Sequence, residues 1–517
     1  MAGFPLTGVD PLDPTPGIIR EIQFAQGLVS GSSNERTVLI YGNKTSAGSE
    51  TADTLDTANP IQSLDDCYAR FGRRSEWAWM YRMFTAVPQS ATIYGIAVAE
   101  NGSGTAASCT FTFATTATGT TNLIVEWGGY QISVPVTTGD TAIVQAAAVT
   151  AKINSWEEGP MPFTAAQGGP TDDHIVTVTT ANLGPRQGLV IDKPLRMYYQ
   201  KSVATTVTKS AITAGTNADD YTNAYALAAN AGPFYYQINP GHTTSAPTST
   251  DNGVGEGAAM ILSQALPSGG KGQQMIFGFV GTNAQLVTVC NALNNVRVKM
   301  WWSENSVWTP GMIAAHYCAI QRLRELAHPG ANLTGYTASD TFVLLHPPPY
   351  DANDRPSATE IRTALNNGGS VITWNGIGKA SIKRCITTRS LNGSVTDYRA
   401  REGHIPSVAD YFWDVFLARH VATVQGLVAA DPLQGQKPLA GVQYPSATAT
   451  LMRDVITDLA GPFIAGSPVL DPGSLAGMLA SVVVLPLNDG LSITASPIAV
   501  RHNNKTQALI RESSPAY

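Results

Sequence analysis

Apolar residues recur at two different spacings near the start of the chain. Residues 37–41 form a short apolar run that predicts a buried strand. Residues 75–87 instead repeat at helical spacing, with large apolar side chains at Trp77, Met80, Tyr81 and Phe84. This pattern predicts an amphipathic helix whose apolar stripe packs into the core instead of binding a ligand.

The segment 93–210 changes to β-type patterns. Short runs rich in β-branched and aromatic residues alternate with Gly, Asn and Thr, and they predict strands at 93–100, 109–117, 123–127, 130–136, 174–180 and 195–199. One Ala-rich helix is predicted at 141–154, with Asp140 as its amino-terminal cap. The segment therefore reads as an inserted β-rich domain.

From about residue 215 to 370, strand and helix patterns alternate. Strands are predicted at 234–238, 275–281, 296–302 and 341–346, and helices at 257–266, 284–294, 310–327 and 358–366. Such alternation is typical of a mostly parallel sheet that helices cover.

The last part of the chain combines hairpins with helices. Residues 371–389 predict a hairpin around Asn375-Gly376, which is a strong turn signal. Two helices are predicted after this hairpin, at 407–424 and 448–459. A final hairpin is predicted around residues 502–504, with strands at 492–500 and 506–513. The proline-rich residues 1–30 predict an extended arm with a strand-like segment at 17–24.

The composition of the 517 residues is low in charge. Only 14% of them are charged, against about 25% in typical soluble domains, and Ser, Thr, Asn and Gly are abundant. Such a surface suits a protein that other subunits cover, or a loop-rich β protein with a neutral exterior. The net charge of −6 and the lack of long basic runs argue against nucleic-acid binding.

The cysteines and the apolar segments bear on the cellular compartment. The five cysteines are far apart and form no Cys-x-x-Cys pair, so we expect free thiols in a reducing cytoplasm and neither a disulfide framework nor a zinc site. We expect no signal peptide, because the start lacks a basic segment followed by an apolar one. The longest apolar stretch, 475–487, is shorter than the about 20 residues that span a membrane.

Several residues are weighed as sites of chemistry. His242 and His346 lie at predicted strand ends, but no Gly-x-Ser-x-Gly elbow accompanies them, so they read as loop residues or partners of backbone carbonyls. Residues 269–272 (Gly-Gly-Lys-Gly) lack the other positions of a phosphate-binding loop and read as a turn.

The candidate metal ligands also lack suitable partners. His316 and Cys318 are two positions apart on a predicted helix and point to different faces. The acidic pairs Asp172-Asp173 and Asp219-Asp220 lack a further ligand at suitable spacing and read as solvated loop residues. We therefore expect no catalytic residues, no cofactor and no metal, and a protein that is not an enzyme.

Three clusters, in order along the chain, resemble contractile tail sheath proteins of bacteriophages, of the Mu-like myovirus type. The first is the β-rich segment, with 130–136, the Ala-rich helix ending at 153–154, residues 162–165 and the turn 181–184. The second is 213–217, which leads into a helix and then to 234–240. The third and most specific is Arg384-Cys385-Ile386-Thr387-Thr388-Arg389, followed by Asp397-Tyr398. One departure is Gly72-Arg73-Arg74-Ser75, where the family often has Gly-x-Gly-Ser.

The resemblance implies an α+β multidomain fold. A sheath core of α/β type and subtilisin-like topology would carry an inserted β-rich protruding domain, an α+β carboxy-terminal domain and extended terminal arms. The expected parts are a 1–30 arm, 31–92 as the first part of the core, 93–210 as the protruding domain, 211–370 as the rest of the core, 371–505 as the carboxy-terminal domain and a 506–517 arm.

The resemblance also implies a structural function. Copies of the chain would form hexameric rings that stack helically around a tail tube, with baseplate and tail terminator proteins at the ends, and no membrane insertion. Contraction in the virion would drive the tube through the host envelope. The sheath of a bacteriocin-type or secretion-type injection device would use the same subunit and stays an alternative, and a monomeric enzyme with a β insertion is the remaining one.

Overall fold

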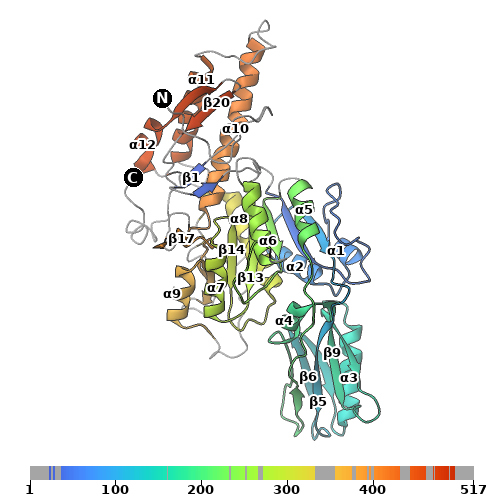
Figure 1. Ribbon diagram of the computed structural model, residues 1–517. Coiled ribbons are helices and arrows are strands. Elements are labelled where there is room, and N and C mark those ends of the chain that lie inside the picture. The colour runs from blue at the N-terminus through green and yellow to red at the C-terminus, as the bar shows by residue number, and fades with distance from the viewer. Residues whose placement is uncertain are drawn as a thin grey trace.

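The structure is a computed structural model with a central unit, a β-rich unit inserted between β4 (Ile93–Val98) and β12 (Tyr236–Asn239) of the central unit, and a carboxy-terminal part (Figure 1). It describes residues 22–24, 27–29, 36–159, 161–231, 234–250, 253–265, 272–331, 333, 355–374, 380–392, 395–396, 401–430, 443–461, 470, 472–487 and 490–494. No helix in these ranges combines the length and the apolar character that crossing a membrane requires.

The central unit is built on a seven-stranded sheet. Its strand order is β16-β15-β14-β13-β12-β3-β4, and all neighbours are parallel except β15 and β16. The strands are β3 (Val38–Asn43), β4 (Ile93–Val98), β12 (Tyr236–Asn239), β13 (Gln274–Phe279), β14 (Val298–Trp302), β15 (Gly369–Trp374) and β16 (Ala380–Arg384). The mostly parallel sheet and the hairpin of β15 and β16 are confirmed. The subtilisin-like topology stays a prediction of the resemblance.

Helices cover both faces of this sheet, which explains why its strands are apolar on both sides. Val38 and Ile40 of β3 belong to one core, while Leu39 and Tyr41 belong to the other. Helices α2 (Glu76–Thr85) and α8 (Pro310–Ala327) pack on the first face. The second face is covered by α5 (Thr222–Ala231), α6 (Val254–Ala265), α7 (Asn283–Leu293) and α9 (Ala358–Asn366). Helix α1 (Leu64–Phe71) packs beside α2.

Two local predictions need correction. Helix α2 is present, but its burial is not confined to a stripe, because Ala78, Trp79 and Met83 are buried as well. The cause is packing between the sheet, α8 and the β-rich unit, which no single-helix pattern reveals. Asp140 is not the cap of the Ala-rich helix; the Thr141 side chain accepts from the Val144 amide, and Asp140 accepts from Thr137 instead.

The β-rich unit consists of two small antiparallel sheets and a helix. A four-stranded sheet has the order β11-β5-β9-β8, and a three-stranded sheet the order β10-β6-β7. The elements are β5 (Ala106–Phe113), β6 (Thr121–Trp127), β7 (Tyr130–Val136), α3 (Ala142–Ser155), β8 (Phe163–Gln167), β9 (Ile175–Leu183), η1 (Pro185–Gln187), α4 (Gly188–Ile191), β10 (Leu195–Tyr199) and β11 (Val207–Lys209). The strand predicted at 93–100 does not lie here; it is β4, which pairs with β3 in the central sheet.

The carboxy-terminal part contains α10 (Ile405–Ala430), α11 (Gln443–Ala460), η3 (Pro472–Ser474), α12 (Leu475–Ala480) and a hairpin of β19 (Val483–Leu487) and β20 (Gly490–Thr494). Strand β20 begins near the strand predicted at 492–500, but its partner is β19; the predicted partner, 506–513, lies outside the described residues. Two short hairpins complete the described chain: β1 (Ile22–Phe24) with β2 (Gly27–Val29), and β17 (Leu391–Asn392) with β18 (Val395–Thr396).

Candidate functional site

The histidines weighed as catalytic or metal-binding residues have structural contacts. His242 Nε2 lies 2.7 Å from the Val280 carbonyl oxygen, and burial lowers the pKa of His242. His316 Nδ1 lies 3.3 Å from the Met83 carbonyl oxygen, and burial lowers the pKa of His316 to about 4. Both rings are therefore neutral at pH 7. His346 lies outside the described residues, and the described part of the chain holds no cluster of three metal-ligating side chains.

The cysteines are free and buried. Burial raises the pKa of Cys385 to about 12 and that of Cys318 still further, so neither thiol is a reactive thiolate at neutral pH. Within the described residues, two groups of largely buried charged side chains lie at boundaries between units.

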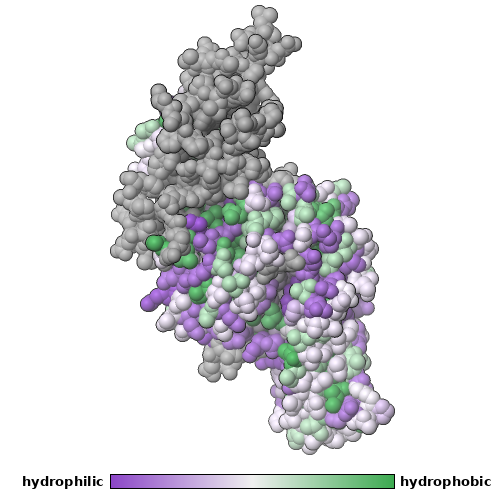
Figure 2. Space-filling model, in the orientation of Figure 1, coloured by the Kyte–Doolittle hydropathy of each residue, from purple (hydrophilic) through white to green (hydrophobic). Residues whose placement is uncertain are grey.

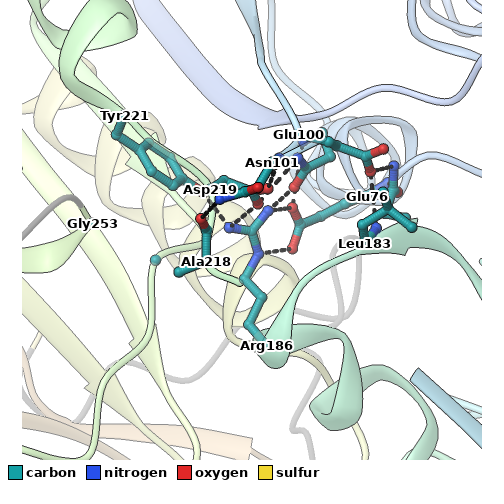
Figure 3. A network of polar contacts seen from close by, with 12 residues as sticks. Glu76, Glu100, Asn101, Leu183, Arg186, Ala218, Asp219, Tyr221 and Gly253 are labelled. Atoms are coloured by element: carbon teal, nitrogen blue, oxygen red, sulfur yellow. Dashed lines mark hydrogen bonds and ion pairs between the residues drawn. The ribbon is translucent and has the colours of Figure 1, made fainter. Parts of the chain in front are cut away.

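The first group joins the β-rich unit to the central sheet (Figure 3). Arg186 follows β9 and points out of the β-rich unit toward carboxylates of the central unit. Its Nη2 lies 2.6 Å from Glu76 Oε2, its Nε 3.1 Å from Glu76 Oε1, and its Nη1 3.3 Å from Asp219 Oδ2. The guanidinium also donates to Tyr221 and to Asn43. We call this group the neck junction.

The charges of the neck junction stabilise one another. Burial alone would lower the pKa of Arg186, but Glu76, Tyr221 and Asp219 raise it above its ordinary value. The arginine therefore stays charged, as a bidentate partner of a carboxylate should. Asn43 Nδ2 donates to Asp219 Oδ2 over 3.2 Å, so the second carboxylate is held as well.

The prediction that Asp219 is a solvated loop residue is wrong, since only 5% of the residue is exposed and the Asn101 amide donates to its Oδ1 over 3.1 Å. Its neighbour Asp220 is exposed, as expected. The partners Asn43 and Asn101 of Asp219 lie 176 and 118 residues away in sequence, and no local pattern marks them.

Arginines of the central unit reach in the opposite direction. Arg74 donates to the carbonyl oxygens of Ile153, Asn154, Met161 and Phe163, at 3.2, 3.0, 3.1 and 2.5 Å. Two of these carbonyls end α3, where a helix presents partial negative charge. Arg74 occupies the place where the resembled family often has glycine, so this departure supplies a contact between the two units.

The turn after β9 belongs to the same junction. The Asn182 side chain donates to Glu100 Oε1 over 2.7 Å and to the Lys44 carbonyl over 2.8 Å, and it accepts from the Glu76 amide. Gly184 follows with φ 98°, a conformation that favours glycine and turns the chain toward Arg186. Burial raises the pKa of Glu100. The resemblance in residues 181–184 thus falls on residues that connect the two units.

A cleft of about 380 Å³ lies beside the neck junction. Arg186, Asp219, Tyr221, His242 and Thr243 are among the residues that line it. It sits past the carboxyl ends of β3 and β12, where the strand order reverses and where α/β sheets commonly bind ligands. The charged groups that line it are already paired with each other, so the cleft presents no free charge of its own.

The second group lies between the central sheet and α10, and we call it the α10 junction. Arg297, just before β14, makes a bidentate pair with Asp410 of α10, at 2.5 Å and 2.8 Å. The Tyr235 hydroxyl donates to Asp410 Oδ2 over 2.9 Å. Only 0% and 1% of the two charged side chains are exposed.

Glu325 of α8 extends this junction. Its Oε2 accepts from the Tyr236 hydroxyl at 2.5 Å and from the Ser407 hydroxyl at 2.7 Å, and its Oε1 lies 3.7 Å from Lys299 Nζ. Arg36 stacks on the Tyr235 ring, 3.7 Å from its centroid. Sequence reasoning missed this network, although Arg297 and Lys299 inside an apolar strand run are a usable signal, because buried charges need partners.

The hairpin segment with the most specific resemblance is fixed by its own polar contacts. Thr388 Oγ1 donates to the Asn295 carbonyl over 3.0 Å, and Ser370 Oγ donates to the Ile386 carbonyl over 2.9 Å. Arg384 pairs with Glu402. These side chains are buried or nearly so, and they join the end of the sheet to the segment that leads into α10.

Comparison with known proteins gives structural matches alone. No protein-family model matches the chain, and neither does any curated protein sequence. A sheath tail protein from Desulfitobacterium hafniense is 11% identical with a TM-score of 0.45, over 94% of this chain and 95% of that one. A sheath tail protein from Listeria innocua is 13% identical with a TM-score of 0.42, over 92% and 94%.

Proposed function

We propose that this chain is the structural subunit of a contractile tail sheath. It assembles with copies of itself into stacked hexameric rings around a tail tube, between baseplate and terminator proteins, as part of a virion. The observation that carries the proposal is the edge position of β16, whose hairpin bears the most specific sequence resemblance. Within the described residues β15 is the one strand that pairs with β16, while the backbone just beyond it, at 385 and 387, bonds to 403 and 401. An open edge binds a further strand through main-chain hydrogen bonds.

The opposite edge of the same sheet is covered. The Ile61 amide donates to the Ile93 carbonyl and the Asp53 amide to the Ala97 carbonyl, both over 2.8 Å, along the outer side of β4. The Asp53 side chain also accepts from the Ala99 amide over 3.2 Å. A second chain has few free groups to pair with there.

The edge strand β8 of the β-rich unit is also protected. The Asn154 side chain accepts from the Ala165 amide over 3.0 Å and donates to the Ala165 carbonyl over 2.8 Å, so its amide group replaces a neighbouring strand. Arg74 occupies the Phe163 carbonyl. Such protection is how proteins prevent unwanted edge pairing. Within the described residues β16 lies at a sheet edge, as do β7, β10 and β11 of the β-rich unit. The sequence resemblance of its hairpin favours β16 as the acceptor.

The strands that would be added are the terminal arms. Residues 17–24 and 507–511 are the predicted strand-forming segments, and the described part of the first, β1, pairs with β2 within the same chain. Exchange of such arms between copies links them head to tail without using charged side chains, which fits the 14% charged residues of the chain.

Contraction then follows from two packings of the same linked subunits. The extended sheath is the less stable packing, and subunits rotate as rigid bodies into the more stable one while the exchanged strands keep neighbours joined. The free energy released drives the tube through the host envelope.

Removal of residues 506–517 tests the strand linkage. We expect the shortened chain to fold, with an unchanged circular dichroism spectrum, but to form no long sheaths in electron micrographs. A matched variant keeps the length and replaces the same residues by a Gly-Ser sequence, which should fail in the same way. Long sheaths from either variant would show that the arm does not link subunits.

A further inference from the structure

The two ends of the central sheet carry charges of opposite sign. At the β4 end, residues 44–71 hold two basic side chains, Lys44 and Arg70, against five carboxylates, which are Glu50, Asp53, Asp56, Asp65 and Asp66. Backbone hydrogen bonds hold this stretch along β4. The exposed Asp220 lies near it, since Asn223 of α5 donates to Asp53 over 3.4 Å.

The β16 end is basic. Residues 355–374 and 380–390 cover α9, β15 and β16, and their charged side chains are Arg355, Arg362, Lys383, Arg384 and Arg389 against a single carboxylate, Glu360. Helix α9 packs beside β15. Figure 1 shows α9 and α1 at opposite ends of the central unit, and Figure 2 shows hydrophilic residues at both ends.

Some of these charged side chains form ion pairs within the same chain. Arg70 pairs with Glu50 over 2.7 Å, and Arg384 pairs with Glu402. Asp65, Arg362 and Lys383 are exposed and make no ion pair within the described part of the chain. The sheet of seven strands spans about 29 Å at about 4.8 Å per strand spacing, so the two sets do not neutralise each other across one molecule.

We propose that the acidic β4 end of one copy docks against the basic β16 end of the next. A twofold contact would place like charges together, whereas a head-to-tail contact pairs opposite charges at every step and leaves one free end of each sign. The charges select the direction and the neighbour, and the exchanged strand then holds the contact. This inference rests on the proposed self-assembly and adds which surfaces meet.

Charge reversal tests the contact. One variant is Arg362→Glu with Lys383→Glu, which reverses two exposed basic side chains of the β16 end. The other is Asp65→Lys with Asp220→Lys, which reverses two exposed carboxylates of the β4 end. A matched control reverses exposed charges of the β-rich unit, Lys201→Glu with Asp172→Lys. Thermal unfolding checks that each variant folds, and sedimentation with electron microscopy measures assembly of the full chain.

We expect each reversed variant alone to need a tenfold or higher concentration to assemble, while an equimolar mixture of the two assembles like the wild type. The control should assemble normally. Normal assembly of either reversed variant alone, or failure of the folded mixture to assemble, would overturn the contact. A wild-type chain that stays monomeric would overturn the proposed function and the contact with it.

Discussion

The neck junction and the α10 junction both join two units through a paired arginine, but they differ in how deeply the pair is buried. At the neck, Arg186 of the β-rich unit pairs with Glu76 and Asp219 of the central unit, and at α10, Arg297 of the central unit pairs with Asp410 of the helix. At the neck, 12% of the Arg186 side chain and 9% of the Glu76 side chain are exposed beside a cleft, whereas Arg297 and Asp410 are 0% and 1% exposed. The first pair is therefore slightly exposed to solvent, and the second is fully buried.

This difference bears on what each junction does. Buried ion pairs add little net stability over apolar packing, but losing one partner is costly, so they favour a single arrangement of the parts. Helix α10 is about 39 Å long at about 1.5 Å per residue over its 26 residues. Its first turns lie in the α10 junction, and Phe412 and Phe416 pack with α11. The orientation of the carboxy-terminal helices is thus set in the driest part of the central unit.

The largest effect is expected from Asp410→Ala. Arg297 would keep its charge in a site without water, at a cost of about 3–5 kcal/mol. Urea unfolding followed by tryptophan fluorescence should show a clearly lower midpoint. Asp458→Ala, which breaks the exposed pair with Arg419, should change stability by about 0–1 kcal/mol. Equal effects of the two substitutions would show that burial does not decide the cost of losing one partner of an ion pair.

Acid should weaken the central unit through His316, which lies on the same helix as Glu325. The pKa of His316 is about 4 in the folded chain, below the ordinary value of about 6.5. The unfolded chain therefore binds the proton more tightly. The stabilisation is fully present above pH 6.5 and is lost as the pH falls toward 4, up to about 3 kcal/mol.

Unfolding measured between pH 7 and pH 4 checks this titration. His316→Asn should flatten the slope. A wild-type slope that persists in the His316→Asn variant would assign the acid sensitivity to other groups.

A smaller effect is expected from Arg186→Ala, because water in the cleft can hydrate Glu76 and Asp219. We expect about 2 kcal/mol, at the lower end for charged hydrogen bonds that lose a partner. Hydrogen exchange should rise in residues 182–189 and 217–221 and stay unchanged around α10. Arg196→Ala, with a 42% exposed side chain, is the matched control within the β-rich unit. Faster exchange around α10 would mean that the two junctions are coupled.

The smallest effect is expected from Asn154→Ala. It frees the Ala165 amide and carbonyl on β8 at a cost of about 1 kcal/mol. The exposed edge should also promote association of the β-rich units, seen as sheet-rich oligomers by light scattering. Asn122→Ala, whose side chain contacts Gln200 at the surface, should remain monomeric under conditions that suppress normal assembly. Equal behaviour of the two variants would mean that Asn154 does not protect the edge.

Local patterns predict the central unit well and its junctions poorly. Helices α8 and α9 match the predicted 310–327 and 358–366, because Thr309-Pro310 and the Ser357–Glu360 capping box mark their starts within a few residues. Strand β4 was grouped with the wrong sheet, since an apolar strand reads the same wherever it pairs.

Long-range contacts explain the rest. Asp219 reads as a loop residue because its partner Asn43 lies 176 positions away, and Asp410 lies 113 positions from Arg297. Neither pair leaves a periodic trace in the sequence.

Electron microscopy of the full chain, expressed alone, tests the central claim most directly. The account predicts hollow tubes or stacked rings in negative stain, in the contracted form because neither tube nor baseplate is present. Dispersed monomers at high concentration, across several buffers and salt concentrations, would contradict a self-assembling sheath subunit.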